Sequence, residues 1–408
     1  MTDIKPRYLV MVTSDNHNKI YKMTPHGDSW TAEYGRVGAS FQRRTYPMSQ
    51  WNSKYNEKIR KGYVDQSDLV EDLISVEKPK KSEYKEIENK VIAEIVERLQ
   101  SMARKAISEN YTISSNKVTQ AMVDEAQGIL TSLIGISDLD TFNEILLKLF
   151  VTIPRKMSDV KSHLAKSDKD FSNIIQNEQD LLDVMKGQVV QKQMIEDVQD
   201  DLPQKECTIL EQLGLVFEEC DAKDIAKIKV ALGEISGKFH KAWRVTNIKT
   251  QKRYDDFVRE NSITNTKLLF HGSRNENWWS IINSGLVLKP TNAVITGALY
   301  GHGIYFAPKA RKSLGYTSLR NSYWANGNSD FGFMALMDVA YGVPYDVYSH
   351  DYRYGSLDYN GLQRMQSGAN CLHAHAGADM GHGNPLRNDE IIIYKEEQAT
   401  IKYLVELR

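Results

Sequence analysis

The chain has 408 residues, 41% hydrophobic and 26% charged, and a formal net charge of −1, values typical of a globular protein with two or three domains. Its three cysteines are an odd number without a CxxC pair, which excludes a disulfide framework and a zinc finger and favours a reducing compartment. The first residues lack the apolar core of a signal peptide, and no run approaches the ~18 apolar residues of a membrane span, so we expect an intracellular protein without membrane contact.

Residues 1–75 are predicted to form a small antiparallel sheet and a helix. Residues 8–13 alternate as a strand does, and a second alternating strand places three residues on one side: Trp30, Ala32 and Tyr34. The spacing of Trp51, Tyr55 and Ile59 predicts a helix near 48–61.

This first module is basic. Residues 1–63 hold eleven Lys or Arg against five Asp or Glu, so the remainder of the chain is acidic. The excess indicates an anionic partner such as nucleic acid, although an ordinary solvated surface would carry the same charges.

Residues 76–90 are charged and poor in apolar side chains, which predicts a linker. From residue 91 to 238 the apolar period becomes helical and predicts an all-α bundle of four or more helices. The stripes that carry this prediction include Ile92, Ile95, Val96 and Leu99, then Val123, Ala126 and Leu130, then Phe142, Ile145 and Leu149. The third stripe stops at Pro154, which cannot continue a helix.

Residues 239–408 show short strands with glycine-rich turns and are predicted to be a mixed α/β domain. The predicted strands are 268–270, 303–307, 331–339, 391–394 and 401–407, and a helix ending at Gly285 follows the first of them. The chain as a whole is therefore predicted to be an α+β multidomain protein.

Three residues of this last segment lie at the edges of predicted strands: His271, Tyr305 and Glu390. Each alone is most simply a packing or solvent-facing residue. Their order and their flanks, Leu-Phe-His-Gly-Ser, Gly-Ile-Tyr-Phe-Ala and Asn-Asp-Glu-Ile-Ile-Ile-Tyr, resemble the His-Tyr-Glu signature of the poly(ADP-ribose) polymerases. These are diphtheria-toxin-type ADP-ribosyltransferases that split NAD+ and pass ADP-ribose to an acceptor.

The resemblance implies a site for NAD+ as substrate, without a metal. His271 would bind the adenosine ribose, the Gly272 backbone and Ser313 would hold the nicotinamide carboxamide, and Ser273 and Asn277 would lie near the same ligand. Tyr305 and Tyr316 would form opposite aromatic walls around the charged ring. Glu390 would bond the ribose 2′-hydroxyl, stabilise the developing cation and help activate the acceptor.

The segment Tyr34-Gly35-Arg36-Val37-Gly38 resembles the signature of the WGR domain, the DNA-end-binding module of this family, with Tyr34 in the place of Trp. With Arg43 and Arg44, the residues Tyr34, Gly35 and Arg36 are the predicted DNA contacts. The segment 149–154 and its place in the chain resemble the family's helical regulatory domain, which covers the NAD+ site until DNA binds.

Other signals are weaker. The GxG at 301–303 lacks the following elements of a dinucleotide-binding unit, so a Rossmann site is not expected. Cys371, His373, His375 and His382 match no standard zinc spacing, and we predict no metal. Two positions depart from the family pattern: His302 stands where Lys is common between two glycines, and Val287 stands where Arg is common after Gly-Leu.

The resemblance thus implies a DNA-break-stimulated ADP-ribosyltransferase that modifies proteins, itself included, or nucleic acids, and that elongates poly(ADP-ribose). It would act as a monomer on DNA ends or nicks, in a nucleus or in a bacterial cytoplasm. Two alternatives stay open: an enzyme that adds single ADP-ribose units, and a catalytically weak DNA-end-binding scaffold.

Overall fold

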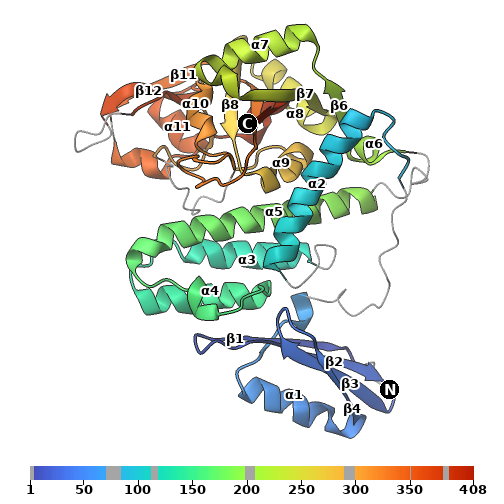
Figure 1. Cartoon of the computed structure of the whole chain (residues 1–408). Helices are drawn as coiled ribbons and strands as arrows, with labels where there is room; N and C mark the ends of the chain where they lie inside the picture. The colour runs from blue at the N-terminus through green and yellow to red at the C-terminus, as the bar shows by residue number, and fades with distance from the viewer. Residues whose placement is uncertain are drawn as a thin grey trace. The chain divides into compact units, whose positions relative to one another are not determined.

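The computed structural model describes residues 4–69, 84–111, 118–197, 207–288, 299–349, 351–379 and 386–408. The chain divides into two compact units, shown with their elements in Figure 1. Unit 1 comprises Met1–Lys81 and Arg104–Val189, and unit 2 comprises Ser82–Ala103 and Val190–Arg408.

Unit 1 begins with a five-stranded sheet in the order β4-β3-β2-β1-β5, with every pair antiparallel. The strands are β1 (Arg7–Val12), β2 (Asn18–His26), β3 (Ser29–Arg36), β4 (Gln42–Pro47) and β5 (Val64–Asp65). Trp30 and Ala32 are fully buried on one face, as their alternation predicts. Helix α1 (Trp51–Arg60) covers this face, and the rings of Trp51 and Trp30 meet edge to face at 5.4 Å.

The helical part of unit 1 follows the predicted stripes. It contains the end of α2 (Lys90–Asn110), α3 (Gln120–Ser132), α4 (Leu139–Thr152) and most of α5 (Phe171–Asp197). The side chains of Thr119 and Asp138 cap α3 and α4 by accepting backbone N–H groups. Between α4 and α5, the rings of Phe142 and Phe171 stack at 3.9 Å.

Arg155 lies in the buried centre of unit 1. Its guanidinium pairs with Glu178 of α5 and stands 5.1 Å from the ring of Tyr111. Its backbone oxygen accepts a hydrogen bond from Asn18 of β2 at 2.9 Å. This residue therefore joins the sheet and the helices of unit 1 in one compact body.

Unit 2 contains a five-stranded sheet in the order β6-β7-β14-β10-β8, again antiparallel throughout. The strands are β6 (Leu215–Glu219), β7 (Phe239–Asn247), β8 (Lys267–Gly272), β10 (Gly332–Val339) and β14 (Ala399–Leu407). Helices α6 (Ile209–Leu213), α7 (Ala222–Leu232) and α8 (Ile248–Glu260) belong to the same unit.

Strand β6 corrects the expectation that residues 91–238 are entirely helical. Gly214 adopts a left-handed conformation that ends α6, and the chain then runs beside β7. Leu215 and Phe217 alternate with exposed residues, so one face of β6 is buried. Strand β6 has only five residues, so its two-residue alternation is too short to be recognised next to the longer helical patterns.

A second, four-stranded sheet in the order β11-β12-β13-β9 completes unit 2. Its strands are β9 (Ile304–Phe306), β11 (Pro344–Ser349), β12 (Cys371–Asp379) and β13 (Glu390–Ile393), and only β11 and β12 are parallel. The remaining helices are α9 (Trp278–Ser284), α10 (Ala310–Leu314) and α11 (Tyr359–Met365). A bridge between Phe270 and Ala307 links the ends of β8 and β9, one from each sheet.

The first turns of α2 pack within unit 2. Arg98 pairs with the buried Glu406 of β14 at 2.9 Å and lies over the rings of Phe331 and Phe333. In the described parts of the chain, neither the long helices nor the short ones have an apolar stretch that would cross a bilayer.

Candidate active site

The three residues singled out from the sequence lie where the two sheets of unit 2 meet. His271 is at the end of β8, and its Nδ1 lies 3.0 Å from the backbone oxygen of Tyr305 in β9. Tyr305 is paired with Ile392 of β13, two residues beyond Glu390. The structure therefore brings together a histidine, a tyrosine and a glutamate that are up to 119 positions apart in the chain.

Glu390 is buried, with 4% of its surface exposed. Its Oε1 pairs with the ammonium of Lys312, which comes from α10. Its other oxygen, Oε2, is buried and has no hydrogen-bond partner among the described residues. A buried carboxylate oxygen without a donor is costly, and this atom is therefore available to accept a hydrogen bond from a ligand.

Gly272 and Ser313 approach each other as closely as backbones can. A Cβ on Gly272 would lie 2.0 Å from the carbonyl oxygen of Ser313, so only glycine fits this position. The Ser313 side chain is buried and donates to the backbone oxygen of Phe270 at 3.2 Å. The end of β8 is thus held against α10, beside the residue that pairs with Glu390.

Aromatic rings surround this point. The hydroxyl of Tyr305 donates to Gly301 and accepts the N–H of Tyr300, so its ring is fixed. Tyr316 stacks on Trp324 with 18° between the ring planes. Burial raises the pKa of Tyr305 and of Tyr316, and the nearby Glu390 carboxylate raises both further, although the Tyr300 N–H lowers that of Tyr305. Both phenols therefore stay protonated near neutral pH, and neither is a general base.

Ser273 and Asn277 follow β8 and bond to each other. The Asn277 amide donates to Ser273 Oγ at 3.0 Å, while its Oδ1 is buried without a partner among the described residues. These two residues lie in the turn after His271 and Gly272, so the predicted ligand-binding positions 271–277 and 313–316 form one continuous site with Glu390.

Two residues of this site were missed by the sequence analysis. Lys312 binds Glu390 and lies 6.0 Å from the rings of both Tyr316 and Trp324. Trp324 is 47% exposed and belongs to a polar loop. An aromatic residue among polar neighbours was the sequence feature that could have pointed to it. The departure His302 is half-buried, and burial lowers its pKa, so it does not supply the positive charge of a lysine near neutral pH.

The predicted DNA contacts lie in unit 1. Tyr34 stacks on Tyr21 at 5.6 Å, so part of its ring is covered by its own sheet. Arg36 donates to the backbone oxygens of Asn16, Met157 and Ser158. A Cβ on Gly35 would lie 2.9 Å from the ring of Phe41, so a larger residue there would displace that ring.

Arg43 and Arg44 are exposed on the edge strand β4. Arg43 pairs with Glu33, and Arg44 lies over the ring of Tyr46 at 5.1 Å. Phe41, just before this strand, is 45% exposed, which the sequence analysis overlooked. Cations and an exposed ring are therefore neighbours along this edge.

Comparison with known proteins defines the class. Residues 222–408 match the model of the poly(ADP-ribose) polymerase catalytic domain. The chain is 31% identical to putative poly [ADP-ribose] polymerase-like 100L of Invertebrate iridescent virus 6, over 47% of this chain and 97% of that protein. It is 35% identical to uncharacterized protein 101L of the same virus, over 44% of this chain and 76% of that protein.

Poly [ADP-ribose] polymerase 2 of Zea mays is 27% identical, over 46% of this chain and 31% of the maize protein. The match over residues 222–408 makes the chain an NAD+ ADP-ribosyltransferase. The chain belongs to the poly(ADP-ribose) polymerase family.

Proposed function

We propose that this ADP-ribosyltransferase is stimulated by DNA ends and that it elongates poly(ADP-ribose) on protein acceptors, itself included. The observation that carries the catalytic part is Glu390, a buried carboxylate that Lys312 holds by one oxygen while the other faces no partner among the described residues. The DNA-dependent part is supported by the basic edge of unit 1.

In the proposed reaction, NAD+ places its nicotinamide beside Gly272 and Ser313. The backbone of Gly272 and the hydroxyl of Ser313 bind the carboxamide, and the rings of Tyr305 and Tyr316 flank the pyridinium. His271, Ser273 and Asn277 bind the remainder of the substrate. Ser313 and Glu390 are buried, which limits the access of water to the bond that breaks.

Glu390 then acts on the ribose. Its free Oε2 accepts the 2′-hydroxyl, and its charge stabilises the cationic ribose as the bond to nicotinamide breaks. Nicotinamide leaves from C1′ of the ribose with the electrons of the broken bond. The acceptor oxygen then forms its bond to C1′ and loses its proton. Where the acceptor is a ribose hydroxyl of a growing chain, the same carboxylate assists its deprotonation, and the product is a polymer.

The stimulation by DNA rests on unit 1. Arg43, Arg44 and the exposed ring of Phe41 would meet phosphates and a terminal base. Arg36 donates to the backbone oxygens of residues 157 and 158, which follow α4, and through these bonds a contact at the sheet would reach the helices. DNA binding would then shift the population of helical arrangements that admit NAD+.

The test compares NAD+ turnover and product length with and without a short 5′-phosphorylated duplex. We expect the wild-type chain to be stimulated and to make long polymer. The double variant Arg43→Ala/Arg44→Ala should keep its basal turnover and lose stimulation. In a plot of the logarithm of the DNA association constant against the logarithm of the salt concentration, each lost phosphate contact should make the slope shallower by about 0.9.

A matched control is the double variant Lys252→Ala/Arg259→Ala, which removes two exposed cations from α8 of unit 2. It should be stimulated like the wild-type chain. If both double variants lost DNA stimulation equally, only the overall charge would matter. The proposal that the β4 edge of unit 1 binds DNA would then be wrong. Products that never exceed one ADP-ribose unit would favour a mono-ADP-ribosyltransferase, and no turnover under any condition would favour a scaffold.

A further inference from the structure

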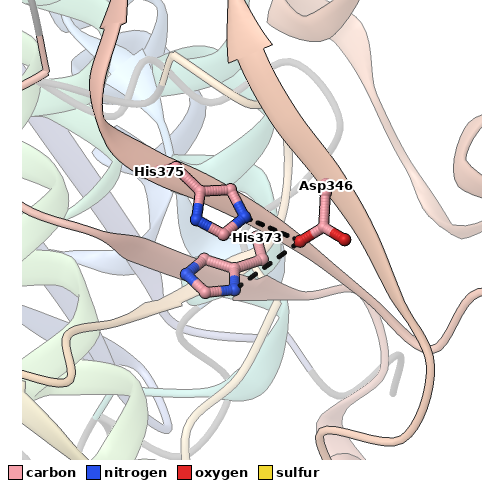
Figure 2. A group of neighbouring side chains, drawn as sticks. All are labelled: Asp346, His373 and His375. Carbon is pink, nitrogen blue, oxygen red and sulfur yellow. Dashed lines mark hydrogen bonds and ion pairs between the residues drawn. The ribbon is translucent and has the colours of Figure 1, made fainter.

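A cluster of imidazole and carboxylate groups lies on the side of the second sheet that faces away from Glu390. His373 and His375 are two residues apart on β12, so both rings lie on one face. Their rings stack with centroids 3.9 Å apart. Asp346 lies on the neighbouring parallel strand β11, where it is paired with His373, and it completes a group of three side chains (Figure 2).

The ligand atoms of this group converge on one point. Asp346 Oδ1 lies 2.7 Å from His375 Nε2 and 3.8 Å from His373 Nδ1, and the three atoms are all within 4.8 Å of one another. The ligand atoms of a tetrahedral zinc ion stand about 3.3 Å apart, between these two distances. Asp346 is 43% exposed, so a fourth ligand has access from solvent.

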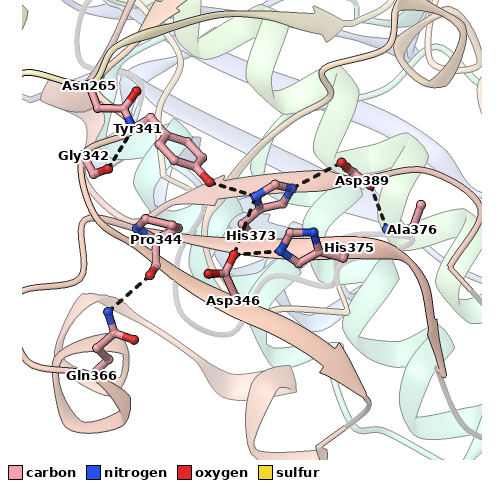
Figure 3. Close-up of polar contacts among 10 residues, drawn as sticks. All are labelled: Asn265, Tyr341, Gly342, Pro344, Asp346, Gln366, His373, His375, Ala376 and Asp389. Atoms are coloured by element: carbon pink, nitrogen blue, oxygen red, sulfur yellow. Dashed lines mark hydrogen bonds and ion pairs between the residues drawn. The ribbon is translucent and has the colours of Figure 1, made fainter.

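A second layer of contacts orients these ligands (Figure 3). His373 Nε2 faces Asp389 Oδ2 at 3.4 Å, and the other oxygen of Asp389 accepts the backbone N–H of Ala376. A carboxylate on the far nitrogen of a histidine is the arrangement that accompanies metal-bound histidines. Tyr348 stacks flat on His375 at 4.4 Å and fixes its ring.

We propose that Asp346, His373 and His375 form a binding site for a divalent transition metal, of the class that accepts imidazole and carboxylate ligands, with zinc as the representative ion. Two histidines and one carboxylate suit zinc, cobalt or nickel, whereas magnesium and calcium prefer oxygen ligands throughout. The sequence prediction of no metal overlooked Asp346, which lies 27 positions before His373.

Two groups oppose the ion. The hydroxyl of Tyr341 lies 2.8 Å from His373 Nδ1 and must give up this hydrogen bond to the metal. The ammonium of Lys267 lies 3.4 Å from the ring centroid of Tyr341 and adds a positive charge nearby. Cys371 is buried in the same strand, but its thiol is not part of the converging group.

The proposed metal site lies on the opposite face of the sheet from the side chain of Glu390, next to strand β13. Ala374, between the two histidines, is paired with Glu390, and Asp389 immediately precedes Glu390. An ion there would tie β11 and β12 together and would hold Asp389 through His373. The bound metal therefore stabilises the sheet that presents Glu390 without entering the reaction.

The experiment measures the binding of Zn²⁺ to the full chain after treatment with a chelator, by competition with a chromogenic chelator, and records the Co²⁺ absorption spectrum. We expect one ion per chain and a higher melting temperature with the metal. Asp346→Asn and His375→Ala should each weaken binding at least 100-fold, and Asp389→Asn should weaken it about 10- to 100-fold. His240→Ala, an exposed histidine elsewhere in unit 2, should bind like the wild-type chain.

Tyr341→Phe gives the sharpest result, because it removes the competing hydroxyl and should tighten Zn²⁺ binding roughly three- to tenfold. Melting curves in chelator establish that each variant is folded. If the wild-type chain binds no more Zn²⁺ than Asp346→Asn, the cluster is a hydrogen-bonded network only and the proposal is wrong. A cobalt spectrum with thiolate character would also overturn it, since the ligand set would then include Cys371.

Discussion

Glu390 and Glu406 are two buried carboxylates on β13 and β14 of unit 2, and they differ in how completely they are bonded. Glu406 is 1% exposed; its Oε2 binds Arg98 at 2.9 Å, and its Oε1 binds Arg408 at 3.0 Å. Glu390 binds only Lys312 among the described residues, and its Oε2 has no donor. A buried carboxylate whose two oxygens both have partners avoids the cost of an unpaired charge, whereas a buried oxygen without a donor costs stability.

The surroundings of the two carboxylates agree with this difference. Arg98 packs over the rings of Phe331 and Phe333, so its pair with Glu406 fastens the first turns of α2 to the sheet. Lys312 comes from a five-residue helix beside the aromatic rings of the site. A buried glutamate–cation pair therefore fastens a helix to the sheet in one place, whereas in the other it leaves one carboxylate oxygen without a donor among the described residues.

The largest expected effect is on catalysis. Glu390→Gln keeps the shape of the side chain but removes the charge that steadies the cationic ribose. We expect kcat to fall about 10²- to 10³-fold, the loss typical of one electrostatic contact to a transition state. The melting temperature should change little, because the gain from removing an oxygen without a donor offsets the loss of the ion pair with Lys312. A variant that melts lower and keeps its turnover would reverse the assignment of the two carboxylates.

The second prediction concerns Glu406 and its main partner. Arg98→Met leaves the buried carboxylate with Arg408 alone and should lower the free energy of unfolding by about 3 kcal/mol. Turnover per folded molecule should stay near that of the wild-type chain. Lys105→Met, at an exposed position of the same helix, is the control and should change stability by less than about 0.5 kcal/mol. Chemical denaturation followed by circular dichroism gives both values.

The third prediction concerns Lys312, the cation that pairs with Glu390, and uses the variant Lys312→Met. Glu390 would lose the bond that orients it, so turnover should fall about 10- to 100-fold, as for one charge-assisted hydrogen bond. Lys312→Arg restores a cation and should recover part of this loss. Equal turnover in Lys312→Met and the wild-type chain, measured with labelled NAD+, would show that Glu390 is positioned by its strand alone.

The smallest expected effect is a pH dependence of stability. Burial raises the pKa of Glu406, but Arg98 and Arg408 outweigh burial and hold it below the usual 4.5. The stabilisation is therefore complete above pH 4.5 and disappears as the pH falls through the lower pKa of the folded state. The difference in melting temperature between the wild-type chain and Glu406→Gln should shrink below that pH. A difference independent of pH would mean that packing, not charge, makes Glu406 important.

The sequence by itself predicted the strands that carry His271, Tyr305 and Glu390 and the helix that ends at Gly285, but not the strands β7, β11 and β12 of the same unit. The stripe from Ile92 to Leu99 became α2, the run before Pro154 became α4, and the runs around His271, Tyr305 and Glu390 became β8, β9 and β13. These elements are readable because burial on one face repeats with the period of the local backbone, and the period is a property of the chain alone.

Only the tertiary structure decided which groups meet. Lys312 reaches Glu390 across 78 positions, Arg98 reaches Glu406 across more than 300, and Asp346 joins His373 through the register of two parallel strands. No periodicity records such pairs, because each depends on how sheets and helices pack. A carboxylate in the sequence is one residue among many, and its role is settled by the number of donors that the fold brings to it.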